Sequence, residues 1–126
     1  MSALPGVRGA GDPVMPETTK RVRKLLRELA GQAWEAEMRV ALGALARKFE
    51  QWEAGALSSA ELHDAIHAYH NGEAREIWKR HSMPDPRIPL AHAVATGVIA
   101  KEKLPSEVLE HLLTLIELFE DQGREG

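Results

Sequence analysis

The sequence predicts an all-α fold, a single helical bundle of four to six helices with a long N-terminal helix. Three observations predict it: alanine, leucine and glutamate dominate, β-branched runs are absent, and apolar residues recur at helical spacing. No segment sustains the alternation of apolar and polar residues that a half-buried strand requires. At 126 residues, the chain has the length of one domain.

The folded domain is expected over residues 17–120, with a flexible tail at each end. Residues 1–16 are rich in glycine and proline and carry almost no large apolar side chain, so they cannot offset the entropy cost of ordering. Residues 121–126 have the same character. The segment between the tails is long enough to bury one hydrophobic core.

The first helix is expected to start after Pro16, with Thr18 or Thr19 as its N-cap, and to run to about Glu53. Its first half carries one apolar stripe (Val22, Leu25, Leu26, Leu29 and Ala33). Its second half carries another, at spacings of 4, 3, 4 and 3 residues (Met38, Leu42, Leu45, Phe49 and Trp52). On one helical wheel the stripes differ by about 160°. Either the helix breaks near Gly31, or one continuous helix buries opposite faces at its two ends. We favour the second interpretation, because a kink needs a stronger cause than one glycine, and it favours an extended or dimeric assembly.

The middle of the chain predicts two shorter helices that meet near Gly72. Gly55 is expected to end the first helix, and a capping box begins the next one at Ser58. Because Gly72 follows an asparagine, a break and a new helix over 73–81 are favoured over one helix across this position.

The last third of the chain predicts a central helix and a wide C-terminal one. Three prolines within residues 84–89 break the chain. Residues 90–100 then form a helix that is apolar almost all round, which is typical of a central position. After a turn, a last helix is expected from Pro105 through Phe119. Its apolar face is wider than one partner helix needs, so it could meet a second chain.

Composition excludes several classes of protein. The chain has no cysteine, which removes disulfides, thiolate zinc sites and cysteine nucleophiles. The N-terminus lacks the apolar core of a signal peptide, and no apolar run reaches the roughly 18 residues of a membrane span. We therefore expect a cytoplasmic protein with no membrane partner. No P-loop, G-x-G-x-x-G or G-x-S-x-G motif occurs, so nucleotide binding and serine hydrolysis have no support.

A basic cluster lies at the start of the first helix. The net charge of −3 does not predict bulk attraction to nucleic acid. Five cations nevertheless fall within eight residues, a density that can contact phosphates (Lys20, Arg21, Arg23, Lys24 and Arg27). An ordinary solvated helix face looks the same, and the cluster could also pair with acidic helices.

Three histidines within residues 63–70 form a polar strip at the edge of an apolar helix face. His63 and His67 have the i, i+4 spacing with which two imidazoles on a helix bind one metal ion, and His67 and His70 have the i, i+3 spacing. A closed site for zinc or another divalent transition metal needs a further ligand, for which the candidates are His92, His111, Glu37 or a symmetry mate. The other interpretation is that these histidines hydrogen-bond at the rim of a core or face solvent.

The same segment supplies candidate groups for acid–base catalysis. His67, His70, Glu73 and Arg75 could converge at the helix bend, and a histidine beside carboxylates can act as a general base. An ordinary network of helical ion pairs uses the same kinds of residue. We favour the network, so the sequence leans away from an enzyme.

Residues 60–78 resemble a segment of a small family of bacterial all-helical proteins that has no assigned activity. The run is A-E-L-H-D-A-I-H-A-Y-H-N-G-E-A-R-E-I-W, with the pattern I-H-x-[YF]-H-x-G-x-x-R-E, and residues 45–55 and 94–99 also fit. The resemblance covers roughly residues 20–119 and implies the fold and its boundaries without catalytic roles. It directs attention to seven positions (Ile66, His67, Tyr69, His70, Gly72, Arg75 and Glu76).

The leading functional hypothesis is a cytoplasmic protein-interaction or regulatory module that acts as a homodimer or with another protein. Its basis is that the apolar helix faces exceed what one small core needs, while no complete catalytic set is present. A small metal- or histidine-dependent enzyme centred on the strip at 63–70 is the second hypothesis, and nucleic-acid binding through residues 20–27 is the third. Three tryptophans either line a pocket or anchor the core or an interface (Trp34, Trp52 and Trp78).

Overall fold

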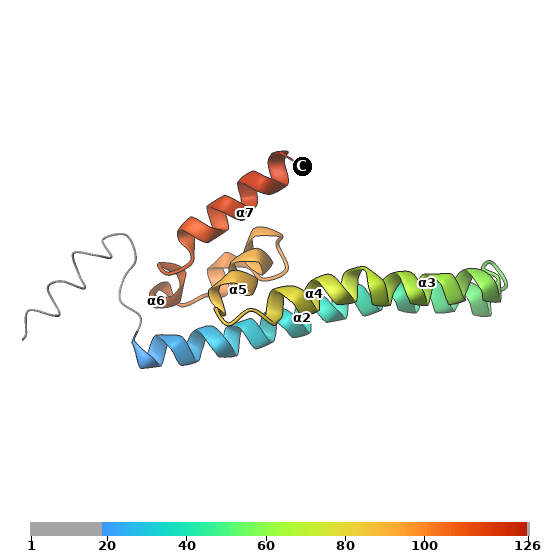
Figure 1. Ribbon diagram of the computed structural model, residues 1–126, viewed down its shortest axis with the longest axis horizontal. Helices are drawn as coiled ribbons and strands as arrows, with labels where there is room; N and C mark the ends of the chain where they lie inside the picture. The colour runs from blue at the N-terminus through green and yellow to red at the C-terminus, as the bar shows by residue number, and fades with distance from the viewer. Residues whose placement is uncertain (1–18, 126) are drawn as a thin grey trace, which may run out of the picture.

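The computed structural model describes residues 19–125, which form six α-helices and one 3-10 turn without a strand (Figure 1). The elements are α2 (Lys20–Glu53), α3 (Ser59–Asn71), α4 (Glu73–His81), α5 (Arg87–Ala95), η1 (Lys101–Lys103), α6 (Ser106–Leu109) and α7 (Leu113–Glu125). The all-α prediction and the predicted number of helices are confirmed. The tail predicted over residues 1–16 lies outside the described residues.

The long first helix, α2, is continuous over 34 residues, so the interpretation without a break at Gly31 is confirmed. The hydroxyl oxygen of Thr19 caps it by accepting a hydrogen bond from the amide of Val22 at 3.1 Å. The chain turns after the helix at Gly55, whose φ of 82° is the left-handed geometry that glycine adopts without strain. Within residues 19–125, no helix combines the length and the hydropathy that a membrane span requires.

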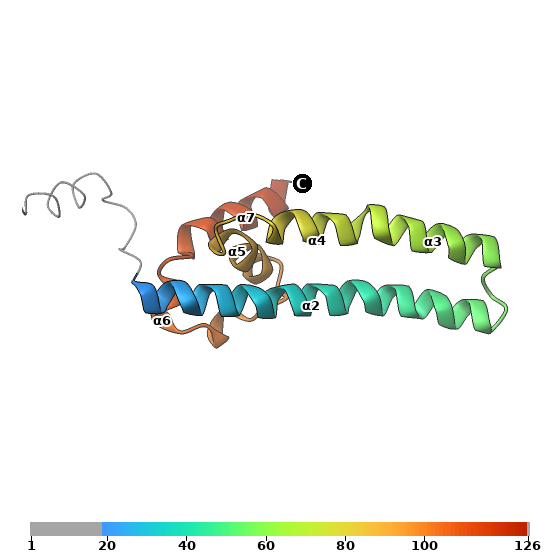
Figure 2. The same cartoon turned by 60° about the horizontal axis from the view of Figure 1, so that its bottom comes forward.

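Helices α3 and α4 return along α2 and form an antiparallel hairpin with it (Figure 2). The predicted capping box starts α3, because Ser58 Oγ accepts from the amide of Glu61 at 3.1 Å and Glu61 Oε1 accepts from the amide of Ser58 at 2.9 Å. Only Gly72 separates α3 from α4, as predicted. A Cβ at Gly72 would lie 2.8 Å from the carbonyl oxygen of Ala68, so this close backbone approach requires glycine.

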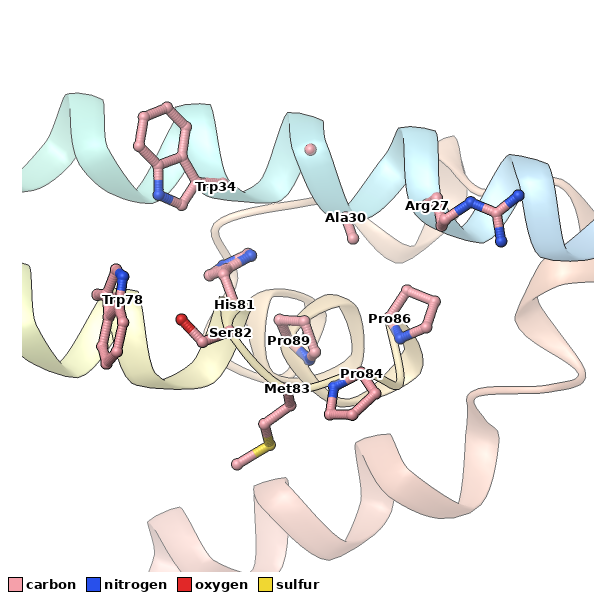
Figure 3. A pocket seen from close by; sticks show the side chains of 11 residues that line it. Arg27, Ala30, Trp34, Trp78, His81, Ser82, Met83, Pro84, Pro86 and Pro89 are labelled. Carbon is pink, nitrogen blue, oxygen red and sulfur yellow. The ribbon is translucent and has the colours of Figure 1, made fainter.

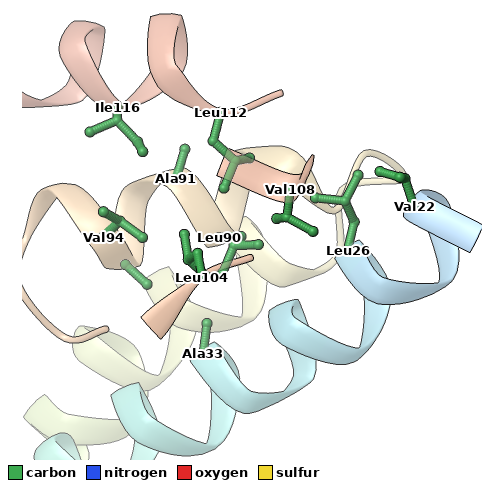
Figure 4. Close-up of a cluster of buried hydrophobic side chains, with 11 residues drawn as sticks. Val22, Leu26, Ala33, Leu90, Ala91, Val94, Leu104, Val108, Leu112 and Ile116 are labelled. Carbon is green, nitrogen blue, oxygen red and sulfur yellow. The ribbon is translucent and has the colours of Figure 1, made fainter. Parts of the chain in front are cut away.

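The hydrophobic core lies at one end of the molecule, where the first half of α2 packs with α5, α6 and α7 (Figure 4). Leu26, Leu90 and Leu112 are at most 2% exposed. Eight smaller or neighbouring apolar residues complete the buried cluster (Val22, Ala33, Ala91, Ala93, Val94, Leu104, Val108 and Ile116). Helix α5 contacts both α2 and α7, which confirms the central position that its apolar surface predicts.

The boundaries of α5 differ from the prediction of a helix over residues 90–100. The helix begins at Arg87, inside the proline-rich segment, with Pro86 at the N-cap position and Pro89 in its first turn. Amides of the first turn have no partner within the helix, so proline is tolerated there. The helix ends at Ala95, and Gly97 then takes a φ of 84° that turns the chain.

The prediction of a single helix from Pro105 through Phe119 is wrong in two respects. The chain forms α6 and α7 with a tight turn between them, in which the amides of His111 and Leu112 bond to carbonyls three residues back. This turn buries both of these side chains in the core. Helix α7 also continues to Glu125, so residues 121–125 are helical where the sequence predicts a tail.

Candidate functional site

A buried carboxylate joins the three central helices. Glu37 lies on a stripe of α2 whose neighbouring buried members are alanines, and it is only 6% exposed. Its Oε1 accepts a hydrogen bond from Nε2 of His81, at the end of α4, over 2.8 Å. Arg80 Nη2 and His92 Nδ1 each lie 3.6 Å from the other carboxylate oxygen, Oε2. One glutamate therefore holds α2, α4 and α5 together.

The surroundings of Glu37 favour its ionised form. Burial raises the pKa of Glu37, but the approach of His92, the hydrogen bond from His81 and the charge of Arg80 outweigh it, so the pKa lies below its ordinary value. Two nitrogens of the cluster, Nε of Arg80 and Nδ1 of His92, are buried without a hydrogen-bond partner in the described part of the chain. We call Glu37, Arg80, His81 and His92 the Glu37 cluster.

Two hollows flank the Glu37 cluster. One, of about 350 Å³, is lined by Glu37, Arg80 and His92. The other, of about 580 Å³, lies between α2 and the connection from α4 to α5, and His81 lines it (Figure 3). A histidine oriented by a buried carboxylate can transfer a proton or bind an anion at its second nitrogen. The cluster thus has the chemistry of a binding or proton-transfer site.

Sequence reasoning named Glu37 and His92 as spare metal ligands and missed both His81 and the cluster itself. A signal was present, because Glu37 interrupts a stripe of alanines at helical spacing along α2. A charged residue in such a stripe must find partners when it is buried. Which cations supply them depends on how α4 and α5 cross α2, and the sequence does not show that.

The histidine strip is exposed along α3 and does not form a cluster with the other predicted ligands. The rings of His63 and His67 meet edge to face, with their centroids 4.6 Å apart. Among residues 19–125, no group of three or more histidine, aspartate or glutamate side chains is placed to hold a metal ion. Glu37 and His92, two of the further ligands considered, belong to the Glu37 cluster between α2, α4 and α5, and His111 is buried in the core. The metal hypothesis gains no support from this placement.

The candidate catalytic residues do not share one hollow. His67, His70, Glu73 and Arg75 are all exposed. His70 and Arg75 line a hollow of about 310 Å³ beside Trp78. Glu73 instead lines a hollow of about 360 Å³ between α2 and α3, and also the hollow of about 350 Å³ beside the Glu37 cluster. The described residues therefore place neither His67 nor His70 in a shared hollow with Glu73.

The five basic residues of the predicted nucleic-acid surface are all exposed on the first two turns of α2. Arg21 forms an ion pair with Glu107 of α6, so part of the positive charge is neutralised within the chain. Arg27 lines the hollow of about 580 Å³. Nucleic-acid binding through residues 20–27 stays a prediction.

The second apolar stripe of α2 lies on the part of the hairpin that extends beyond the core (Figures 1 and 2). Leu42, Phe49 and Trp52 are 46%, 40% and 41% exposed, and Ile66 on α3 is 39% exposed. Met38 and Leu45 are half-buried. Within residues 19–125, α3 and α4 are the elements that pack against this half of α2, and no third layer covers the far end. We call these five residues of α2 (Met38, Leu42, Leu45, Phe49 and Trp52) the hairpin stripe.

No family model, no curated protein and no solved structure matches the chain. The resemblance of residues 60–78 to a family of bacterial helical proteins therefore stays a prediction, and the functional argument depends on the geometry described above.

Proposed function

We propose that the protein is an interaction module of the cytoplasm that assembles with a second copy of itself through the hairpin stripe. The observation that carries the proposal is the exposure of Leu42, Phe49 and Trp52 on a segment only two helices thick. Leaving several large apolar side chains in water forgoes about 25 cal/mol for each Å² that a partner could cover. Large exposed apolar side chains gathered on one part of a helix are typical of a protein–protein contact.

The spacing of the hairpin stripe supports a helical partner. Its members recur at intervals of 4, 3, 4 and 3 residues, the heptad pattern with which one helix packs against another. Two hairpins packed through such stripes would form a four-helix bundle, in which each apolar seam is covered. A sheet or a loop offers no matching periodicity.

The order of side chains along the stripe supports a second copy of this chain as the partner. If two stripes run antiparallel about a two-fold axis at Leu45, Leu42 of one copy faces Phe49 of the other, and Met38 faces Trp52. Each pair joins a smaller side chain to a larger one, which fills space evenly along the seam. A two-fold interface of this kind is self-complementary, as symmetric dimers require.

The test is the mass of the full chain in solution, measured by light scattering during size-exclusion chromatography. We expect a dimer for the wild type and a monomer for Phe49→Glu, because a buried, unpaired carboxylate in the seam is strongly unfavourable. Leu118→Glu is the matched control, since Leu118 is an exposed leucine on α7 at 50% exposure and lies outside the stripe.

Two outcomes would contradict the proposal. The first is a wild-type chain that stays monomeric at high micromolar concentration, because such a chain does not self-associate. A dimer that Leu118→Glu dissociates and Phe49→Glu leaves intact would place the interface on α7, the other wide face predicted from the sequence.

A further inference from the structure

The hollow of about 580 Å³ beside His81 has the size of a small-molecule site, for which roughly 300–1,000 Å³ is usual. It lies where the core end of the molecule meets the hairpin, between α2 and the segment from Trp78 to Pro89. Three prolines line it (Pro84, Pro86 and Pro89). Because proline fixes its own φ, this wall is formed before a ligand arrives.

Two tryptophans stand at one end of the hollow. Trp34 on α2 is 44% exposed and Trp78 on α4 is 67% exposed, and both line it (Figure 3). The third tryptophan, Trp52, donates its Nε1–H to Ser59 Oγ over 3.0 Å and lies outside the hollow. Exposed indoles on both walls provide faces on which a planar ring can stack.

The cation of Arg27 lies at the other end of the hollow. Arg27 lies two helical turns before Trp34 on the same face of α2, about 10 Å away along the axis, and Figure 3 shows it opposite the indoles. Its guanidinium makes no ion pair or hydrogen bond with the described residues, although it lines the hollow. A guanidinium presents two parallel N–H groups that match a carboxylate.

His81 adds a second polar group to the hollow. Its Nε2 is engaged by the buried carboxylate of Glu37 at 2.8 Å. The side chain of His81 is 11% exposed and lines the hollow. The bond to Glu37 fixes the plane of its ring.

We infer that this hollow binds a small planar aromatic carboxylate, with its ring against Trp34 and Trp78 and its carboxylate on Arg27. His81 adds a polar edge to the same hollow. The apolar walls and the single free cation favour this class over a sugar, which needs more hydrogen-bonding groups, and over a metal or a cation, which Arg27 repels. The site is separate from the hairpin stripe and does not depend on dimerisation.

The three tryptophans provide the readout, because each indole N–H gives its own NMR signal. We would titrate the ¹⁵N-labelled full chain with naphthalene-2-carboxylate and, separately, with the neutral naphthalene-2-methanol. Saturable shifts of the Trp34 and Trp78 signals, with Trp52 unmoved and tighter binding of the carboxylate than of the alcohol, are expected.

Variants separate the charge contact from general apolar binding. Arg27→Gln should weaken binding of the carboxylate by about tenfold or more, because a charged hydrogen bond is lost, and should leave the alcohol unchanged. Lys24→Gln removes an equal charge one turn away and should leave both affinities unchanged. Phe49→Glu should bind both probes as the wild type does, which separates this site from the hairpin interface.

Three results would overturn the inference. One is the absence of saturable shifts at Trp34 and Trp78. Another is movement of all three indole signals together, which indicates general adsorption to apolar surface. The third is an equal loss of carboxylate binding in Arg27→Gln and Lys24→Gln, which would reduce the contact to the overall field of the basic cluster.

Discussion

The two halves of α2 carry apolar stripes of similar size, but the two stripes differ in how much of their surface is exposed. In the first half, Val22, Leu26 and Ala33 are at most 6% exposed, because α5 and α6 pack over them and α7 packs on α5. In the second half, Leu42 and Phe49 stay at least 40% exposed, because the chain returns there as a single helical layer. The same helix is thus a core element at one end and an open surface at the other.

The difference shows that burial depends on the number of layers rather than on the apolar pattern. A helix needs a partner on every side where it carries apolar residues. At the core end, residues 87–125 provide those partners. Beyond Glu37, the hairpin has one neighbour for each helix, so a second copy of the chain is the partner that we propose for the stripe.

Truncating a leucine at each end of the molecule should separate the two regions most clearly by their stability. Leu90→Ala, at a side chain with 0% exposure, should lower the free energy of unfolding by about 2–5 kcal/mol. Leu42→Ala should cost about 0.5 kcal/mol or less, as exposed substitutions do. Urea denaturation in the Phe49→Glu background measures both without a contribution from dimerisation. Equal losses at the two positions would mean that the hairpin is as well buried as the core.

The junction between the two ends should respond to Glu37→Gln. The variant removes the charge that pairs with His81 and Arg80 and should cost about 1–3 kcal/mol near neutral pH. Because the folded-state pKa of Glu37 lies below its ordinary value of 4.5, the ionised group stabilises the fold above that pH. This stabilisation is lost as the pH falls through the lowered value, where a protonated glutamate resembles glutamine.

The measurement for Glu37→Gln is thermal unfolding of variant and wild type between neutral pH and about pH 3. The difference in stability between the wild type and Glu37→Gln should shrink as the pH falls. Glu35→Gln is the control, because Glu35 is an exposed acid on the same helix that pairs with the exposed Arg39 and should change stability by about 0.5 kcal/mol or less. If the difference in stability between the wild type and Glu37→Gln stays constant with pH, Glu37 contributes through packing rather than through its charge.

A smaller effect is expected at the tip of the hairpin. Ser58→Ala removes the capping box of α3 and should cost about 1 kcal/mol. Ser106 is the first residue of α6, after Pro105 at the N-cap position, so Ser106→Ala is a serine substitution at the core end that removes no N-cap and has little expected effect. Hydrogen exchange of the α3 amides reports the local change. If the α3 amides exchange no faster in Ser58→Ala, the tip does not depend on its cap.

The smallest effect is a gain in stability from Gly43→Ala. Gly43 lies inside α2, and a Cβ there meets nothing within 4 Å, so the variant should gain about 0.5–1 kcal/mol by reducing the entropy of the unfolded chain. Gly72→Ala should have the opposite sign, because its Cβ would clash with the Ala68 carbonyl. Thermal unfolding distinguishes the two. A loss of stability in Gly43→Ala would indicate that a partner packs closely against that position.

Much of the fold follows from local signals. Thr19 and Ser58 mark helix starts because their side chains accept backbone hydrogen bonds, and Gly55 and Gly72 mark ends because few other residues adopt or fit those conformations. The division of the last helix was missed because the tight turn at 110–112 contains no glycine or proline. That turn exists because His111 and Leu112 both pack into the core, which is a tertiary effect.

The candidate sites also differ in how far local sequence patterns reveal them. The histidine strip could be found from spacing, and its exposure on α3 agrees with the interpretation that these side chains face solvent. The Glu37 cluster could be suspected from one charged residue in an alanine stripe. Its members lie on three helices, and no local pattern connects Glu37 to His81, 44 positions away.

Local sequence patterns are enough to show that the chain is helical, where most helices begin, and that α2 carries two apolar faces, because hydrogen bonding and side-chain periodicity act over a few residues. The packing of distant helices sets which of those faces is buried, which cations surround Glu37, and that Arg27, Trp34 and Trp78 line one hollow. Those outcomes depend on how helices far apart in the chain cross one another, and this is set by packing of the whole molecule.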